Sequence, residues 1–327
     1  MNILVTGGAG YVGSHAARLL TREGHRVVVF DNLSRGHAAA VLDLPLVRGD
    51  LSDRGLLAKT MRERKIDAVM HFAAFSLVGE SVTDPNLYYD NNVVGSLRLL
   101  QAMRDAGVAK IVFSSTTATY GVPEKSPIAE STPQQPINPY GFSKRTVEHM
   151  LDDFAAAYGI GFAALRYFNA AGASADGVIG EDHRPESHLI PLVLQVALGQ
   201  RETITIFGND YSTPDGTCIR DYIHVDDLAT AHLSALTKLQ PGQGLKLNLG
   251  SGVGYSVQRV IEMCREVTGH AIPSVMGPRR PGDPPALVAD SSLAQRTLGW
   301  QCCYSDLRTI VTSAWNWHRA HPHGYGG

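Results

Sequence analysis

The chain has 327 residues, with 29 Lys plus Arg against 31 Asp plus Glu and a formal net charge of −2 at pH 7. This balance excludes the strongly basic surface typical of proteins that bind nucleic acids or anionic membranes, so we expect neither partner. A strand-like run directly after Met1, four cysteines without Cys-x-x-Cys spacing and no apolar segment long enough to span a bilayer predict a cytoplasmic protein.

A glycine-rich turn follows the first predicted strand. Residues 6–13 read TGGAGYVG behind the apolar run 3–5. Gly7, Gly10 and Gly13 allow backbone N–H groups to approach a pyrophosphate at a helix N-terminus. The next predicted strand, 26–30, ends at Asp31, where a carboxylate binds an adenosine ribose and repels a 2′-phosphate. The pattern predicts dinucleotide binding with NAD favoured over NADP; the alternative is a tight turn in an unliganded α/β domain.

Strand-like and helix-like segments then alternate through the first half of the chain, which predicts a doubly wound parallel sheet. Further strands are predicted at 45–47, 68–72, 111–115 and 161–167, and helices at 53–64, 87–106 and 138–158. Beyond Asn169 the alternation is less regular, and polar loops are expected at 180–185, 209–216 and 278–285.

The predicted fold class is therefore α/β, with a Rossmann-type doubly wound sheet and a smaller α/β substrate-binding lobe. We expect a dinucleotide-binding domain over residues 1–168 and the substrate-binding lobe over 169–327. Parts of about 220–250, including 225–239 and 246–249, are candidates to return to the first domain.

The segment YGFSK, residues 140–144, carries the predicted chemistry. Asn138 suits a helix N-cap and Pro139 the first helical position, so Tyr140 and Lys144 share one helix face. A phenol titrates near ~10, and lowering its pKa by about three units needs roughly 4 kcal/mol of differential stabilisation. A nearby ammonium, a cationic nicotinamide ring and the helix N-terminus all favour the phenolate. The alternative, a partly exposed tyrosine beside a solvated lysine, is common by chance.

The strand before this helix ends in hydroxyl groups, FSSTTATYG over residues 113–121. One hydroxyl there could hold a substrate oxygen beside Tyr140 and relay its proton. For Ser114 and Ser115, capping of backbone groups is an equally open interpretation.

No metal site is predicted. His318, His321 and His323 have no acid or cysteine cluster beside them and precede a glycine-rich end, so we expect solvated histidines on a flexible tail. His71, on an apolar strand, is expected to be a hydrogen-bonded core residue.

These motifs resemble those of the extended short-chain dehydrogenases/reductases, and more narrowly of the UDP-glucose 4-epimerases (UDP-galactose 4-epimerases). The resemblance runs nearly end to end, and its most specific block is FGNDYSTPDGTCIRDYIHV at 207–225. Its other motifs lie at 6–13, 31–32, 71–74, 78–81, 89–92, 113–121, 140–144, 166–169 and 278–283.

The resemblance implies a role for each matching residue. Tyr140 is the catalytic base, Lys144 positions it and binds the nicotinamide ribose, and Thr116 is the third catalytic hydroxyl. The implied NAD-binding residues are Gly7, Gly10, Tyr11, Val12, Gly13, Asp31, Asn32, Asp50, Leu51, Phe72, Ala73, Ala74, Asn91, Tyr140, Lys144 and Phe168. The implied UDP-sugar-binding residues are Thr116, Asn169, Leu189, Thr205, Phe207, Arg220, Tyr222, Arg280, Asp283 and Leu287. His188 stands where some relatives have an asparagine and is implied as a weaker UDP contact.

The activity implied is reversible epimerisation at C4 of UDP-glucose and UDP-galactose, through a transient 4-keto sugar and bound NAD, in galactose metabolism. The resemblance also implies a homodimer, formed through helices near 87–106 and 144–158. Thr117-Ala118 after Thr116 argues against a 4,6-dehydratase, which needs an Asp-Glu pair there.

Three alternatives stay open. Leu287, at the position that gates the sugar 2-substituent in relatives, is intermediate in size. Two other activities therefore stay open: a UDP-N-acetylglucosamine 4-epimerase, and a dual-specific or UDP-pentose 4-epimerase. A non-enzymatic NAD-sensing protein on the same fold is the third.

Overall fold

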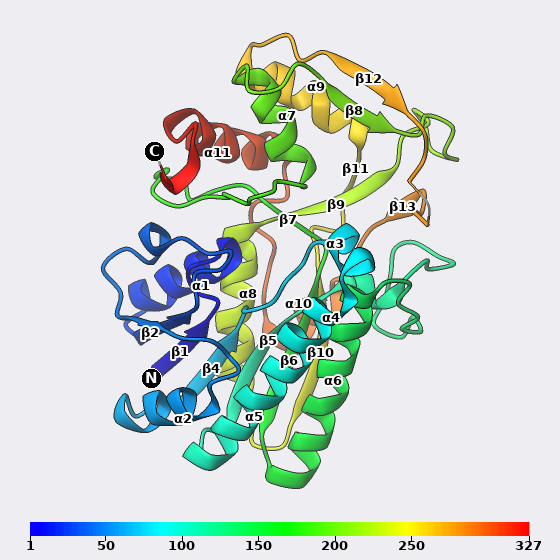
Figure 1. Ribbon diagram of the computed structural model, residues 1–327. Coiled ribbons are helices and arrows are strands. Elements are labelled where there is room, and N and C mark those ends of the chain that lie inside the picture. The colour runs from blue at the N-terminus through cyan, green and yellow to red at the C-terminus, as the bar shows by residue number, and fades with distance from the viewer. Residues whose placement is uncertain (281, 327) are drawn as a thin grey trace.

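The computed structural model describes residues 1–280 and 282–326, and its centre is a seven-stranded parallel sheet (Figure 1). Pro281, in the predicted motif 278–283, and Gly327, in the predicted tail, lie outside the described residues. The strand order is β10-β6-β5-β4-β1-β2-β3. The strands are β1 (Asn2–Thr6), β2 (Arg26–Asp31), β3 (Leu46–Arg48), β4 (Ala68–His71), β5 (Lys110–Thr116), β6 (Gly161–Tyr167) and β10 (Gly244–Leu249). The predicted doubly wound parallel sheet is confirmed.

Helices cover both faces of this sheet. On one side α1 packs against α8, and α10 contacts both α8 and β10; on the other, α2 packs against α5 and α5 against α6. The two faces have separate apolar cores because neighbouring strand side chains alternate: Ile3 and Val5 join the first core and Leu4 the second. These helices are α1 (Tyr11–Arg22), α2 (Arg54–Glu63), α5 (Gly95–Ala106), α6 (Pro139–Tyr158), α8 (Val225–Lys238) and α10 (Ser292–Leu298).

The helix predicted at 87–106 contains a π-helical turn. Short helices α3 (Val78–Thr83) and α4 (Pro85–Tyr88) lead into a π-helical turn, Tyr89–Val94, before α5 begins. The wider turn leaves Asn92 buried, where its amide donates to Phe75 O (3.0 Å) and Ser143 Oγ (3.1 Å). The long helix predicted over 87–106 is confirmed, but its π-turn was not predicted, because the extra residue in that turn cannot be read from the apolar repeat.

The remaining elements form a second region above the carboxyl ends of the sheet strands (Figure 1). Its strands β11, β9 and β13 form one sheet with β7 also paired to β9, and β12 pairs β8. Its core includes Ile190, Ile206 and Val260. The elements are β7 (Asn169–Ala171), α7 (Leu189–Ala197), β8 (Ile204–Phe207), β9 (Ile219–His224), β11 (Gly254–Ser256), α9 (Val257–Thr268), β12 (Ser274–Gly277), β13 (Ala286–Leu287) and α11 (Leu307–Ala320).

The segment 220–250 is divided between the two regions. β9 belongs to the second region, whereas α8 packs on the central sheet and β10 pairs with β6 in parallel. The boundary at residues 168 and 169 stays a prediction.

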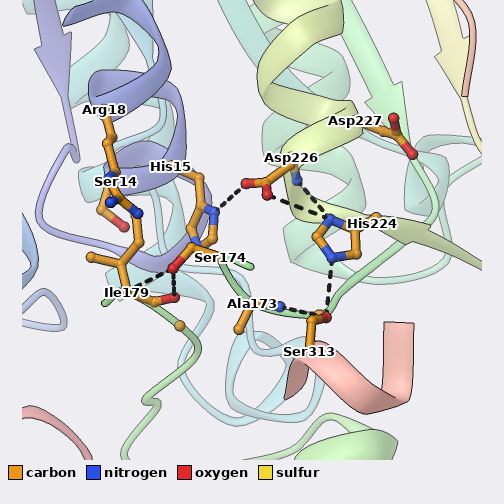
Figure 2. A network of polar contacts seen from close by, with 12 residues as sticks. Ser14, His15, Arg18, Ala173, Ser174, Ile179, His224, Asp226, Asp227 and Ser313 are labelled. Carbon is orange, nitrogen blue, oxygen red and sulfur yellow. Dashed lines mark hydrogen bonds and ion pairs between the residues drawn. The ribbon is translucent and has the colours of Figure 1, made fainter. Parts of the chain in front are cut away.

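A polar network joins the two regions (Figure 2). Asp226, in the first turn of α8, accepts from His15 Nδ1 of α1 at 2.7 Å, and its own N–H donates to His224 Nδ1 at 3.1 Å. His224 Nε2 meets Ser313 Oγ of α11 at 3.1 Å, and Ala173 N donates to the same oxygen. Elements far apart in the chain are thus held together by directional bonds.

The C-terminal residues dock against the protein. Tyr325 donates its N–H to Asp182 Oδ2 (3.0 Å) and its hydroxyl bonds to Gly180, while the His321 ring stacks on Trp317 with 3.7 Å between centroids. The prediction of solvated histidines was wrong for His318 and His321, which are partly buried, and is confirmed for His323, which is exposed; the tail residue Tyr325 is docked rather than free. No helix within residues 1–280 and 282–326 is both long and apolar enough to cross a lipid bilayer.

Candidate active site

The predicted catalytic residues meet at the carboxyl edge of the sheet. Thr116 ends β5, and Tyr140 and Lys144 lie in the first turns of α6, which packs against β5. The predicted N-cap is confirmed: Asn138 Oδ1 accepts from Gly141 N at 2.8 Å. Lys144 Nζ donates to Ser114 O at 2.7 Å and lies 6.0 Å from the Tyr140 ring centroid.

Burial controls the titration of this pair. It raises the pKa of Tyr140 above its usual value, opposed by a hydrogen bond with Thr116. Burial also lowers the pKa of Lys144 to about 7, opposed by the Glu148 carboxylate. In the protein alone, desolvation of the buried phenol outweighs the groups around it; the expected lowering of the Tyr140 pKa includes the nicotinamide ring and stays a prediction.

A buried ion pair supports this edge from behind. Glu148, one helical turn after Lys144, accepts from Ser115 Oγ (2.6 Å) and Arg166 Nε (2.9 Å). Arg166 donates to Tyr120 at 2.8 Å, and Tyr120 donates to Asn248 Oδ1 at 2.7 Å. The ends of β5, β6 and β10 are therefore tied to α6.

This network settles the role of one serine and shows what sequence reasoning missed. The Ser115 hydroxyl donates to the Glu148 carboxylate rather than capping a backbone group, so its role is structural. The sequence gave no role to Glu148 or Arg166. In the sequence, Glu148 is visible only as a charged residue one helical turn after Lys144, and Arg166 only as an arginine inside an apolar strand.

The glycine turn forms a cradle suited to a pyrophosphate. A Cβ at Gly7 would lie 2.4 Å from Ala73 N, and one at Gly13 would lie 2.2 Å from Gly7 O, so both positions need glycine. Gly10 is the N-cap of α1, and within the described chain neither a capping side chain nor a first-turn acid neutralises that helix end. Tyr11 is anchored through its hydroxyl to Gly172 O (2.6 Å), and Val12 follows it in the first turn. These residues fit an NAD pyrophosphate.

The predicted adenosine-side residues lie together. Asp31 is buried at the end of β2, where its carboxylate accepts from Ala9 N (3.0 Å) and Leu33 N (2.8 Å) and so also fixes the glycine turn. Asn32 donates to Asp50 Oδ2 at 2.7 Å, and Leu51 is buried beside them. Burial raises the pKa of Asp31, opposed by those backbone bonds.

The other predicted NAD-binding residues follow β4 and β6 or lie in the π-turn. Phe72, Ala73 and Ala74 come directly after β4, and the Phe72 ring lies 4.7 Å from that of His232. Asn91 donates to the buried Asn92 at 2.9 Å. His71 is hydrogen-bonded on both ring nitrogens, to Thr6 and Ser96, as predicted for a core residue.

Phe168 and Leu287 meet in one apolar cluster. Phe168 is buried there with Tyr120, Ile128 and Ala289, and Leu287 packs against it. The structure therefore brings the predicted nicotinamide contact next to the predicted gate for the sugar 2-substituent.

The predicted UDP residues converge from several short elements. Arg220 forms an ion pair with Asp283, and the Arg280 guanidinium lies 4.2 Å from the Phe207 ring centroid. Asn169 and Tyr222 are paired across β7 and β9. Thr205 and Phe207 share β8, whereas Leu189 begins α7, so the set is discontinuous in sequence.

Known proteins are similar to this chain over nearly its whole length. The NAD dependent epimerase/dehydratase family matches residues 3–250. The UDP-glucose 4-epimerase of Halalkalibacterium halodurans is 57% identical over 326 residues, covering 99% of this chain and 98% of the relative. The Brucella ovis UDP-glucose 4-epimerase, solved in complex with NAD, is 50% identical with a TM-score of 0.93, covering 96% and 97% of the two chains. The Bifidobacterium longum UDP-glucose 4-epimerase, solved with NAD⁺ and UDP, is 39% identical with a TM-score of 0.94, covering 99% and 100%.

Proposed function

The chain belongs to the NAD dependent epimerase/dehydratase family, and on that premise we propose that it interconverts UDP-glucose and UDP-galactose by inversion at C4 of the hexose. It is an NAD-dependent isomerase. One observation carries the proposal: Tyr140, Lys144 and Thr116 stand at the same sheet edge as the glycine cradle, in a chain that resembles UDP-glucose 4-epimerases along its whole length.

Tyr140, Thr116 and Lys144 have different roles in the reaction at C4. Tyr140 takes the proton of the 4-hydroxyl, and Thr116, which hydrogen-bonds with the phenol, orients that hydroxyl. Bound NAD supplies reversible hydride acceptance, which permits inversion without net oxidation. Lys144 is held by Ser114 O, where it can bind the nicotinamide ribose and add positive charge beside Tyr140. Because burial alone raises the Tyr140 pKa, phenolate formation depends on positive charge gained when the site is filled.

The remaining residues hold the two ends of the ligands. Arg220 and Arg280 bind the UDP pyrophosphate. A guanidinium group is always charged and can donate two parallel hydrogen bonds to phosphate oxygens. Asn169, Leu189, Thr205, Phe207, Tyr222 and Asp283 line the nucleotide, and Leu287 the sugar. Firm binding of UDP leaves the 4-keto sugar free to turn about its link and present its other face.

The test is conversion without added cofactor. The purified protein is incubated with UDP-galactose alone, and UDP-glucose is measured by chromatography; we expect conversion toward equilibrium, faster after NAD is added if some was lost. Failure to convert either sugar even with NAD present would overturn the proposal and favour the NAD-sensing alternative.

We further infer that the protein is a homodimer in the cytoplasm. Tyr89 and Val94 of the π-turn and Phe142 and Tyr158 of α6 are 39–50% exposed apolar or aromatic side chains on adjoining helices. Light scattering should give twice the chain mass, and Phe142→Glu should shift it toward the monomer. A wild-type monomer at micromolar concentration would contradict the inference.

A further inference from the structure

A compact cluster of histidines and glutamates lies in the loop before α7, outside the residues used above for catalysis. Glu181, His183, Glu186 and His188 each offer one ligand atom, and these four atoms all lie within 4.8 Å of one another. Among residues 1–280 and 282–326, this is the one such group of three or more metal-ligating side chains.

We propose that Glu181, His183, Glu186 and His188 bind one divalent transition-metal ion, with Zn²⁺ the best match. Two imidazoles and two carboxylates suit zinc, which takes four nitrogen and oxygen ligands in tetrahedral sites. Neutral imidazoles would leave the set with two negative charges, which a divalent cation balances.

The spacing of the ligand atoms supports this choice. Zinc bonds of about 2.0–2.2 Å place tetrahedral ligand atoms roughly 3.3–3.6 Å apart. His183 Nδ1 lies 3.1 Å from Glu181 Oε1 and 3.8 Å from Glu186 Oε2, and His188 Nδ1 lies 3.8 Å from Glu186 Oε1. Only the contact between His188 and Glu181 is markedly closer than a coordinated pair, so His188 would move outward on metal binding.

The Glu186 carboxylate is fixed by backbone N–H groups, and the Glu181 backbone is anchored to α11. Glu186 Oε1 accepts from the backbone N–H groups of Ser187 (2.7 Å) and His188 (2.8 Å). The Glu181 carbonyl accepts from Trp317 Nε1 of α11 at 3.2 Å. Both glutamate side chains are nearly covered, at 3% and 6% exposure, and one oxygen of each lies within 4.8 Å of the other.

Access comes from the histidine side. The His188 side chain is 44% exposed and the His183 side chain 27%, which leaves a path for an ion from solvent. The competing state is a set of ion pairs in which both histidines are protonated. A metal displaces those protons, so zinc binding should release protons into the buffer.

The position of the cluster indicates what the ion would do. His188 immediately precedes α7, whose first residue Leu189 is a predicted UDP contact, and the His183 ring meets Tyr11 of the glycine turn edge-on at 6.1 Å. A metal would therefore connect the loop, α7 and the cofactor cradle. It would act on stability rather than on a chemical step.

The first measurement uses untagged wild-type protein and needs no variant. The full chain is stripped with a chelator and dialysed, and then titrated with Zn²⁺ or Co²⁺. We expect one equivalent of zinc by mass spectrometry, release of protons, intense visible bands of tetrahedral Co²⁺ and a zinc-dependent rise in Tm. Less than about a tenth of an equivalent retained after gel filtration, with no Co²⁺ bands, would overturn the proposal and leave the ion-pair state.

Variants then locate the ion. His183→Gln and Glu186→Gln should each weaken zinc binding about 100-fold or more, since even residues that only support metal ligands contribute 10–100-fold. His323→Gln is the matched control, because His323 is exposed and lies in the other group of histidines. Equal losses in all three variants, or none in the first two, would contradict the assignment. Metal content is measured without turnover, so its outcome is independent of the epimerase proposal.

Discussion

The catalytic edge and the UDP-binding side of the site are built on different scaffolds. Thr116, Tyr140 and Lys144 stand on neighbouring long elements, β5 and α6, with a buried ion pair behind them. The predicted UDP residues stand on strands of two to six residues, at the start of α7 and on the loop between β12 and β13. The difference suggests that the position of the chemistry is fixed by the parallel sheet, whereas the substrate contacts can change with less cost to the fold.

The largest expected effect is on the catalytic edge. Tyr140→Phe removes the only phenolic oxygen assigned to proton transfer and should lower kcat by about 10²–10⁴-fold. NAD content and UDP affinity should stay near wild type. The control is Tyr158→Phe, which makes the same change at an exposed position of the same helix. Full turnover by Tyr140→Phe would remove the tyrosine from the mechanism and weaken the contrast between the two sides.

The ion pair behind that edge should matter most for stability. Glu148→Gln leaves the Arg166 guanidinium buried without its carboxylate, which should cost about 3–5 kcal/mol in the free energy of unfolding. Urea denaturation would measure this cost. Asp153→Asn, at an exposed position of α6, should change it by less than about 0.5 kcal/mol. If Glu148→Gln had the same free energy of unfolding as the wild type, the packing of α6 on β5 would not depend on this ion pair.

On the UDP side, adjacent arginines give a matched comparison. Arg280→Ala should reduce kcat/KM for UDP-galactose about 10–100-fold, chiefly through KM, because a charged hydrogen bond contributes about 1.5–3 kcal/mol. Arg279 instead binds Asp210 and covers the Tyr211 ring, so Arg279→Ala should change KM little. If both variants raised KM alike, Arg280 would have no special contact with UDP.

The free energy of unfolding should also fall in mild acid, because of His71 on strand β4 of the central sheet. Burial lowers the pKa of His71 to about 3, so this histidine stays neutral in the folded state while the unfolded chain takes up a proton below about 6.5. Stability is therefore lost as the pH falls, by about 2 kcal/mol between pH 6.5 and 5 from His71 alone. Denaturation curves at both pH values should show a smaller loss for His71→Gln than for the exposed-site control His149→Gln. If both variants lost the same stability between the two pH values, protonation of His71 on unfolding would not contribute to the acid sensitivity.

The smallest predicted effect concerns sugar choice. Leu287→Tyr adds bulk beside Phe168 and should lower activity on UDP-N-acetylglucosamine relative to UDP-glucose by about 10-fold, the size expected for a pocket contact. Steady-state rates on both sugar pairs measure the ratio. A wild-type protein faster on the acetamido pair would make the UDP-N-acetylglucosamine alternative the better one.

Local sequence signals were sufficient for the Rossmann half of the molecule. The strands at 2–6, 26–31 and 161–167, the Asn138 cap and the glycine turn depend on neighbours in the chain, so apolar runs and cap residues predict them. The π-turn at 89–94 and the docked C-terminus were missed, because each depends on contacts with distant residues such as Ser143 and Asp182.

For the site, the sequence by itself predicted which residues would carry chemistry: glycines for a pyrophosphate, a tyrosine and lysine one turn apart, and arginines for phosphates. Tertiary structure alone decided how they are supported. It paired Glu148 with Arg166, placed Leu287 against the apolar cluster that contains Phe168 and gathered the histidines and glutamates at 181–188. The physical reason is that helix and strand formation is local, whereas buried charge pairing and side-chain packing depend on which segments the fold brings together.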